Sequence, residues 1–334
     1  MRYVPFCNVP LLKQVSIAAA IFGALAIRLM FHRSKNRTII VYNVFSPFSL
    51  PVIAAALFFG VKAVAIIADL PDEVYGFRGF RGLLMRLDFF VEKRILRCFD
   101  GVISLTVDTV NDFARGKPAI IVEGGVWDGD WEQMTSMADG SSNSKVCLYS
   151  GTLDKVNGIP VLLEAFSLLK QSDYELHIYG NGPMAGTVEA AAAIDQRIRY
   201  FGRLPAKEVR QRQARATVLL NVRPPSLVIS RYTFPSKLLE YMAAGRPTIS
   251  TVFPSLPNDY RKHLYLLRTE SAAELAELIR EVCSQSSAKL EELGRSAREF
   301  ARGTKNWKVQ GKSVYEFISA IERGTAFGAS RNAV

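Results

Sequence analysis

The feature that most constrains this chain is an alternation between β-branched runs and helical runs that occurs twice. In the first half, runs such as TIIVYN (residues 38–43) and KAVAIIADL (residues 62–70) alternate with apolar or amphipathic helical segments. The alternation restarts at KVCLYSGTL and continues through YELHIYGNGP, ATVLLNVRP and PTISTVF. Buried strands that alternate with helices form parallel sheets with helices on both faces. The sequence therefore predicts an α/β protein with two doubly wound, Rossmann-like domains.

A polar stretch of small residues separates the two series. This stretch, WDGDWEQMTSMADGSSNSK, is typical of a domain linker. We expect an N-terminal domain at 1–143, a C-terminal domain at 144–310, and a last helix with a mobile tail at 311–334. That helix either crosses back to the first domain or completes the second. Two such domains leave a cleft at the carboxyl ends of their sheets, where ligands usually bind.

The charge of the chain predicts an anionic partner. The formal net charge is +11 at pH 7, which favours binding to anions, but no nucleic-acid-binding motif accompanies it. The four cysteines and three histidines are scattered without metal-ligand spacing. This pattern predicts no metal site, and it favours a reducing compartment.

The N-terminal region is basic and contains an uncharged run. Seven basic residues and no acidic ones precede Asp69, and residues 15–27 form an uncharged run of 13 residues. At ~1.5 Å per residue such a run covers about 20 Å of a ~30 Å hydrocarbon core. We therefore expect a buried or interfacial helix, with a signal peptide or anchor and a true membrane span as the alternatives.

A second basic segment interleaves arginines with aromatic residues. The segment YGFRGFRGLLMRLDFFVEKRILRCF, residues 75–99, carries Arg78, Arg81 and Arg86 near its start. Such a helix can bind anionic lipid headgroups or a lipid-pyrophosphate acceptor, or it can be the solvated face of a core helix. We favour the membrane and acceptor role for the three arginines.

The segment YTFPSKLLEYMAAGRPTIST, residues 232–251, predicts an anion site. Pro235 suits a first helical turn, and Gly245 suits the left-handed position just past a helix. The free N–H groups at the helix start bind anions, and Lys237 and Arg223 add positive charge. Glu240 lies about one turn beyond Lys237, where a carboxylate can accept both hydroxyls of a ribose. Spacing alone equally fits a surface helix with a Lys–Glu pair.

The residues around this segment resemble one enzyme family. They are similar to the donor-site helix of retaining GT-B glycosyltransferases of family 4, the group 1 glycosyltransferases, in the branch that builds bacterial exopolysaccharide, capsule and O-antigen. The resemblance is specific over about residues 145–282 and weaker in the N-terminal half. The residues that carry it are Asn221, Arg223, Pro224, Tyr232, Phe234, Pro235, Ser236, Lys237, Glu240, Tyr241, Met242, Ala243, Gly245 and Pro247.

The resemblance implies a GT-B fold, with two Rossmann-like domains facing a cleft, and a set of site residues. Lys237, Arg223 and Asp69 would be catalytic. Donor binding would fall to Glu240 for the ribose, to residues 234–236 for the diphosphate, and to residues 202–204 for the base. The donor-binding residues implied are Glu240, Ser236, Pro235, Phe234, Tyr232, Gly151, Thr152, Lys155, Gly202, Arg203 and Leu204.

Some positions depart from the family pattern. Tyr232 stands where many members have a second Glu, while Thr152 and Asn157 stand where many have Arg and Lys. The usual opening strand and Gly-rich loop are not seen before Val15, so we expect a shortened N-terminal domain.

The function that the resemblance implies is the transfer of a sugar, with retention, from a UDP- or GDP-linked donor to a lipid-linked saccharide. The enzyme would need neither a metal nor another cofactor. It would be cytoplasmic, attached peripherally to the inner face of the cell membrane through anionic lipid, and it would bind no nucleic acid. The alternatives are a GT-B sugar-nucleotide epimerase and a non-catalytic subunit that binds a nucleotide sugar or a partner transferase.

Overall fold

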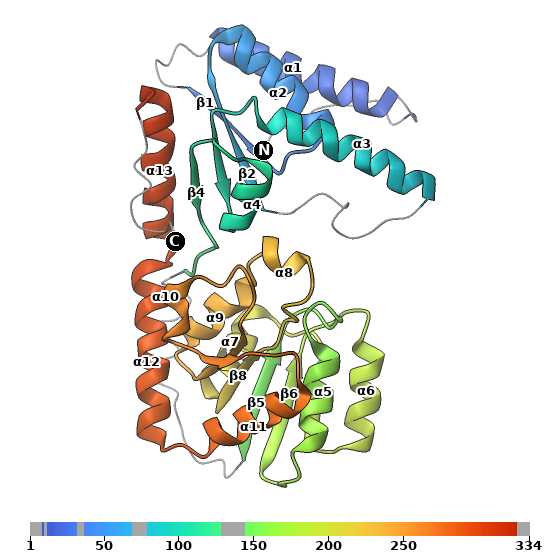
Figure 1. Cartoon of the computed structure of the whole chain (residues 1–334), viewed down its shortest axis with the longest axis vertical. Coiled ribbons are helices and arrows are strands. Elements are labelled where there is room, and N and C mark those ends of the chain that lie inside the picture. The colour runs from blue at the N-terminus through green and yellow to red at the C-terminus, as the bar shows by residue number, and fades with distance from the viewer. Residues whose placement is uncertain (1–8, 10–11, 32–36, 69–78, 128–143, 326–334) are drawn as a thin grey trace. The chain divides into compact units, whose positions relative to one another are not determined.

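The chain divides into two compact units. The computed structural model describes residues 9, 12–31, 37–68, 79–127 and 144–325. The first unit comprises Met1–Glu123 and Gly311–Val334, and the second comprises Gly124–Gln310 (Figure 1). The first boundary thus falls about twenty residues before the one expected at 143, because residues 124–127 pack with the second unit. The linker segment 128–143 lies outside the described residues.

The first unit is a four-stranded parallel sheet with helices on both faces. The strands follow the order β1-β2-β3-β4, and all pairs are parallel. The last helix of the chain, α13 (Trp307–Arg323), belongs to this unit from Gly311 onward. The other elements of the unit are α1 (Leu12–Phe31), β1 (Thr38–Tyr42), α2 (Ser46–Phe59), β2 (Lys62–Ile67), α3 (Gly79–Leu96), β3 (Gly101–Ser104), α4 (Val107–Phe113) and β4 (Ala119–Ile121).

The two faces of this sheet alternate along β2, as the two-residue period of a strand requires. Ala63 and Ala65 point to a core formed with α1, α2 and α3, whereas Val64 points to a core formed with Phe317 and Ile321 of α13. In Figure 1, α13 accordingly runs along one side of the sheet and α1, α2 and α3 lie on the other. Helices on both faces explain why these strands read as continuous apolar runs.

The N-terminal helix is longer and more exposed than the sequence predicts. α1 has 20 residues, from Leu12 to Phe31, and no residue of it is buried. At ~1.5 Å per residue it is about 30 Å long, so the argument that it is too short to cross a membrane was wrong. Lys13 and Arg28 do not end the helix, because Lys and Arg are good helix formers. In the described part of the chain, α1 is the one helix whose length and hydropathy suit a membrane span.

The second unit is a six-stranded parallel sheet of doubly wound topology. Its strand order is β10-β9-β8-β5-β6-β7. Successive strands are therefore added on one side of β5 up to β7 and on the other side from β8 onward, and the switch point lies between β5 and β8. Ligands bind at such a switch point, outside the carboxyl ends of the strands. The elements are β5 (Lys145–Ser150), α5 (Ile159–Leu168), β6 (Tyr174–Tyr179), α6 (Ala185–Ile194), β7 (Ile198–Tyr200), α7 (Ala206–Arg215), β8 (Val218–Asn221), α8 (Ile229–Tyr232), α9 (Ser236–Ala244), β9 (Thr248–Thr251), α10 (Asn258–Arg261), β10 (Tyr265–Leu267), α11 (Ala272–Cys283) and α12 (Ser287–Thr304).

We expect the first unit to depend on Phe317, which is fully buried against its sheet. Phe317→Ala should lower the free energy of unfolding of this unit by about 3–5 kcal/mol, because it leaves a cavity against Val64 and Ile103. Tyr315→Ala on the same helix is the matched control, since Tyr315 is 72% exposed. Urea denaturation measures both variants, and equal losses in the two would contradict this packing.

Candidate functional site

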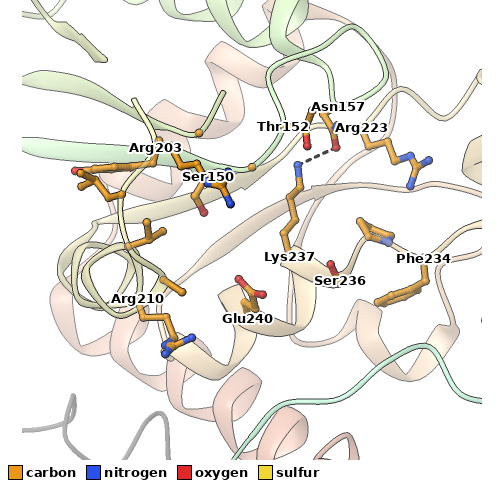
Figure 2. Close-up of a pocket in the computed structure, with 17 residues that line it drawn as sticks. Ser150, Thr152, Asn157, Arg203, Arg210, Arg223, Phe234, Ser236, Lys237 and Glu240 are labelled. Carbon is orange, nitrogen blue, oxygen red and sulfur yellow. Dashed lines mark hydrogen bonds between the residues drawn. The ribbon is translucent and has the colours of Figure 1, made fainter. Parts of the chain in front are cut away.

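A pocket of about 430 Å³ opens at the carboxyl ends of β5 and β8 in the second unit. It lies at the switch point of the sheet, where α9 begins (Figure 2). The lining residues come from the ends of β5, β6 and β8, from the loops that follow β5 and β7, and from α7 and α9. They are Ser150, Gly151, Thr152, Asn157, Tyr179, Gly180, Arg203, Leu204, Ala206, Val209, Arg210, Arg223, Phe234, Pro235, Ser236, Lys237 and Glu240.

α9 is held with its N-terminus at this pocket. Pro235 is the residue before the helix, and Gly245 ends it in the left-handed conformation at φ 71°. Tyr241 Oη donates to the Ser150 carbonyl at 3.1 Å and accepts from the Ser150 N–H at 2.8 Å, which joins the buried face of α9 to the end of β5. At the other end, Arg298 Nη2 donates to the Ala244 carbonyl at 3.2 Å. The first N–H groups of a helix fixed in this way are available to an anion.

Lys237 is the most constrained cation of the pocket. Its Nζ donates to Tyr149 Oη and to Asn157 Oδ1, both at 2.8 Å, and lies 4.4 Å from the centre of the Tyr149 ring. Burial lowers the pKa of Lys237 to about 7, while the charge of Asp154 opposes that shift. A bound anion would therefore favour the protonated, charged form of this amine.

A glycine is required where Lys237 crosses the loop after β5. Gly151 has a φ of 149°, and a Cβ there would lie 2.8 Å from Lys237 Nζ. Gly180, which follows β6 at a φ of 133°, would place a Cβ 1.8 Å from the Gly151 carbonyl oxygen. The two loops therefore approach each other closely only because both positions lack a side chain.

Glu240 lies on the pocket side of α9, one turn beyond Lys237, and Figure 2 shows both side chains directed into the same space. Its carboxylate reaches solvent through the pocket. Burial nevertheless raises the pKa of Glu240, because the pocket walls displace bulk water, and the charges of Arg210 and Lys237 partly offset the shift. The site thus places a carboxylate, an amine and three arginines around one cavity.

The structure brings most of the expected donor residues into this pocket. Arg223 stands just past β8 and is buried, and Phe234 is fixed by its ring contacts with Phe253 and Tyr260. Of the expected residues, these line the pocket: Gly151, Thr152, Arg203, Leu204, Arg223, Phe234, Pro235, Ser236, Lys237 and Glu240.

Several expected residues lie elsewhere. Tyr232, Lys155 and Gly202 are not among the lining residues, although the Gly202 carbonyl accepts from the N–H of the lining residue Gly180 at 2.8 Å. Asp69 and Arg78 lie outside the described residues. For Arg81 and Arg86 the structure describes the backbone within α3 but not the side chains.

Sequence reasoning did not nominate several residues that line the pocket or hold Lys237. Tyr149 reads as a core residue of β5, yet its hydroxyl accepts from Lys237 and donates to the Thr152 carbonyl at 2.7 Å. Arg210 and Tyr179 line the wall, and Asn157 holds Lys237. No motif marks Arg210, because the sequence of α7 is typical of a basic surface helix.

Within the described ranges no three His, Cys, Asp or Glu side chains group as a metal site, and metal independence stays a prediction.

Comparison with known proteins agrees with this geometry. Residues 144–285 match the sequence model of the family described as glycosyl transferases group 1. No curated protein matches the chain.

Solved structures show the fold. Sucrose-phosphate synthase from Thermosynechococcus elongatus is 16% identical with a TM-score of 0.70, over 95% of this chain and 82% of that one. Anabaena Alr3699/HepE in complex with UDP is 14% identical with a TM-score of 0.70, over 94% and 85% of the two chains. The α,α-trehalose-phosphate synthase (UDP-forming) from Burkholderia xenovorans is 12% identical with a TM-score of 0.66, over 90% and 77%. The chain therefore has the GT-B fold with two Rossmann-like units, and its residues 144–285 match the group 1 glycosyltransferase domain.

Proposed function

We propose that this protein is a glycosyltransferase that moves a sugar, with retention, from a nucleotide sugar to a lipid-linked saccharide in bacterial surface polysaccharide synthesis. The observation that carries the donor half of the proposal is the arrangement on α9. Lys237, Glu240 and the helix N-terminus converge on one pocket at the switch point of a doubly wound sheet. The match of residues 144–285 to the group 1 glycosyltransferases supports the same reaction class.

The donor would bind along α9. Its diphosphate would take the free N–H groups around Ser236 and the charges of Lys237 and Arg223, because a helix N-terminus and two cations favour a dianion. The ribose would give both hydroxyls to Glu240, and the base would lie against Arg203 and Leu204. HepE was solved with UDP and with UDP-glucose, which supports a uridine donor, with GDP-linked sugars as the second choice.

The reaction would break the bond between the anomeric carbon of the sugar and the diphosphate oxygen. The electron pair of that bond leaves with the nucleoside diphosphate, so negative charge grows where Lys237 and Arg223 lie. Cations placed there stabilise the transition state more than the ground state. The acceptor hydroxyl would attack the same face of the sugar, and its proton would pass to the departing diphosphate. No metal is needed in this scheme, and Asp69 stays proposed as a catalytic residue.

Two other functions fit parts of the site less well. An epimerase needs acid and base groups beside the sugar, whereas Glu240 is the one carboxylate among the described residues that line the pocket. A non-catalytic nucleotide-sugar-binding subunit would have the same donor pocket, so only a measurement of sugar transfer can distinguish it from an enzyme.

The test of the proposed function is a transfer assay with the full-length protein. The protein is incubated with a panel of labelled nucleotide sugars and a bacterial membrane extract, with and without EDTA. We expect label from one donor to enter the lipid fraction, equally in both conditions. Donor binding without transfer to lipid or water would identify a binding subunit, and interconversion of the donor sugar would identify an epimerase.

Glu240→Ala should weaken nucleotide binding by on the order of 1.5–3 kcal/mol, because a charged acceptor of two ribose hydroxyls is lost. The matched control is Glu164→Ala on α5, an exposed carboxylate away from the pocket. Calorimetry with a ribonucleotide and its 2′-deoxy analogue separates the contribution of the diol. Wild-type affinity in Glu240→Ala would remove Glu240 from the site.

Binding of a nucleotide sugar should take up a proton above pH 7. The pKa of Lys237 is about 7 in the protein alone, so the neutral amine dominates above that pH, while a bound diphosphate favours the charged amine. The bound pKa is therefore the higher one, and affinity should fall as pH rises through 7. Calorimetry in buffers of different ionisation enthalpy measures the uptake, and Lys237→Gln should abolish it. Proton-neutral binding by the wild type would contradict this assignment.

Arg210→Gln should make donor binding more sensitive to acid. Removing the attraction of Arg210 raises the pKa of Glu240 further, so protonation of the ribose acceptor begins at a higher pH. Donor affinity falls as Glu240 becomes protonated at acid pH, and in Arg210→Gln this fall should therefore begin at a higher pH than in the wild type. Arg215→Gln on the same helix, away from the lining residues, should leave the pH of this fall unchanged; an equal shift in both variants would point to net charge instead.

A further inference from the structure

The N-terminal helix α1 is apolar on two opposite faces. One face carries Ile21, Leu25 and Leu29, which recur every four residues and pack on the core of the first unit. The opposite face is exposed toward both ends of the helix: Leu12, Val15 and Met30 show 56%, 65% and 57% of their surface. A helix that is apolar all round is normally buried in protein or lipid, whereas the described residues cover only one side of α1.

The neighbouring helix extends this exposed surface. α1 and α2 pack against each other, as Figure 1 shows for the first unit. On α2, Leu50, Leu57 and Phe58 are 51%, 75% and 77% exposed. We call these outward side chains of the two helices the apolar face; it consists of Leu12, Val15, Ile27, Met30 and Phe31 of α1 and Leu50, Leu57 and Phe58 of α2. Contiguous apolar surface of this kind marks an interaction site.

The charges around the apolar face favour an anionic bilayer over a second copy of the chain. Lys13 and Arg28 are exposed near the two ends of α1, and Lys93 and Arg94 lie in the last turn of α3. No acidic residue precedes Asp69 in the sequence. The exposed Asp88 of α3 accepts a hydrogen bond from Ser46 Oγ at the start of α2, so the basic residues outnumber the acidic ones here. Two copies joined through this face would bring like charges together. Anionic lipid headgroups would instead complement the basic residues while acyl chains cover the apolar ones.

We propose that the apolar face is embedded in the cytoplasmic leaflet of the membrane, with α1 lying in the membrane plane rather than crossing it. The contacts of Ile21, Leu25 and Leu29 lie in the C-terminal half of α1, which also packs against α2, so α1 cannot cross the bilayer without withdrawing this half from the core of its own unit. The proposal rests on the proposed function in one respect, because a lipid-linked acceptor would lie in the same leaflet.

This attachment differs from the peripheral attachment through anionic lipid that the sequence predicts. Salt screens the attraction between exposed charges. Burial of Leu57, Phe58 and the outer side of α1 among acyl chains would instead attach the protein by the hydrophobic effect, which salt does not weaken. The predicted behaviour is that of a firmly embedded protein that never reaches the far side of the membrane.

Fractionation of cells that express the full-length chain tests the embedding. We expect the protein to stay with membranes through high salt and alkaline carbonate and to leave only with detergent. The triple variant Val15→Gln, Ile27→Gln, Met30→Gln should lower the ratio of membrane-bound to soluble protein by about tenfold or more. Val107→Gln, Ile194→Gln, Val228→Gln is the matched control, since these exposed apolar residues lie off the apolar face. Circular dichroism checks that both variants fold.

Release of the wild type by salt or carbonate would overturn the proposal. So would a soluble wild-type dimer that the triple variant converts to a monomer, because a second copy would then cover the apolar face. These readouts need no turnover, so they remain informative if the transfer assay fails, and a failed embedding leaves the donor-binding assays untouched.

Labelling separates the in-plane orientation from a span. Lys13→Cys and Arg28→Cys are made singly with Cys7 and Cys98 replaced by Ser, which leaves the buried Cys147 and Cys283. In intact spheroplasts a membrane-impermeant maleimide should label neither position, and after the membrane is opened it should label both. Labelling of either position from outside would mean that α1 crosses the bilayer and would overturn the in-plane orientation.

Discussion

The donor pocket depends on how one ammonium group is held. Lys237 Nζ is fixed by Tyr149 Oη and Asn157 Oδ1 beneath a loop that only Gly151 can form. Tyr149 comes from the end of β5, Asn157 from the loop after it, and Lys237 from the first turn of α9. The contact therefore ties β5 and the loop that follows it to α9 at the switch point of the sheet. An anion that enters here meets an amine already in position, which reduces the cost of ordering a long side chain.

The burial that holds Lys237 also explains its chemistry. Enclosure lowers the pKa of Lys237 and raises that of Glu240, so each group is poised to gain charge stabilisation from a ligand of the complementary kind. Tyr241 and Arg298 keep α9 in place from its two ends. The helix N-terminus, the amine and the carboxylate then face one cavity, as binding of a nucleoside diphosphate requires.

Much of the second unit can be predicted from sequence, for identifiable reasons. The parallel strands read as β-branched runs because both faces of each are buried, and Pro235 and Gly245 mark the ends of α9 by their backbone preferences. Arg210, Tyr149 and Tyr179 could not be found in this way, since their roles arise from strands and helices that meet only in the folded unit. Tyr232 shares the motif with Lys237 but lies off the pocket, because sequence proximity does not fix the direction of a side chain.

The first unit was harder to predict from sequence. Sequence reasoning places the ends of this helix at the ends of its uncharged run. A charged residue does not end a helix, and Lys13 and Arg28 both lie inside α1. Exposure of its outer face depends on which side the core of the unit covers, and periodicity cannot show this when both faces are apolar. The sheet itself follows the alternating pattern expected of it, with α13 supplying the helix on one face.

The most direct test of the central claim is a crystal structure of the protein with a nucleotide sugar bound. The account predicts a diphosphate oxygen within about 3 Å of Lys237 Nζ, with the phosphates at the N-terminus of α9 and both ribose hydroxyls on Glu240. A nucleotide bound elsewhere, or one that leaves Lys237 and Glu240 without contact, would contradict it.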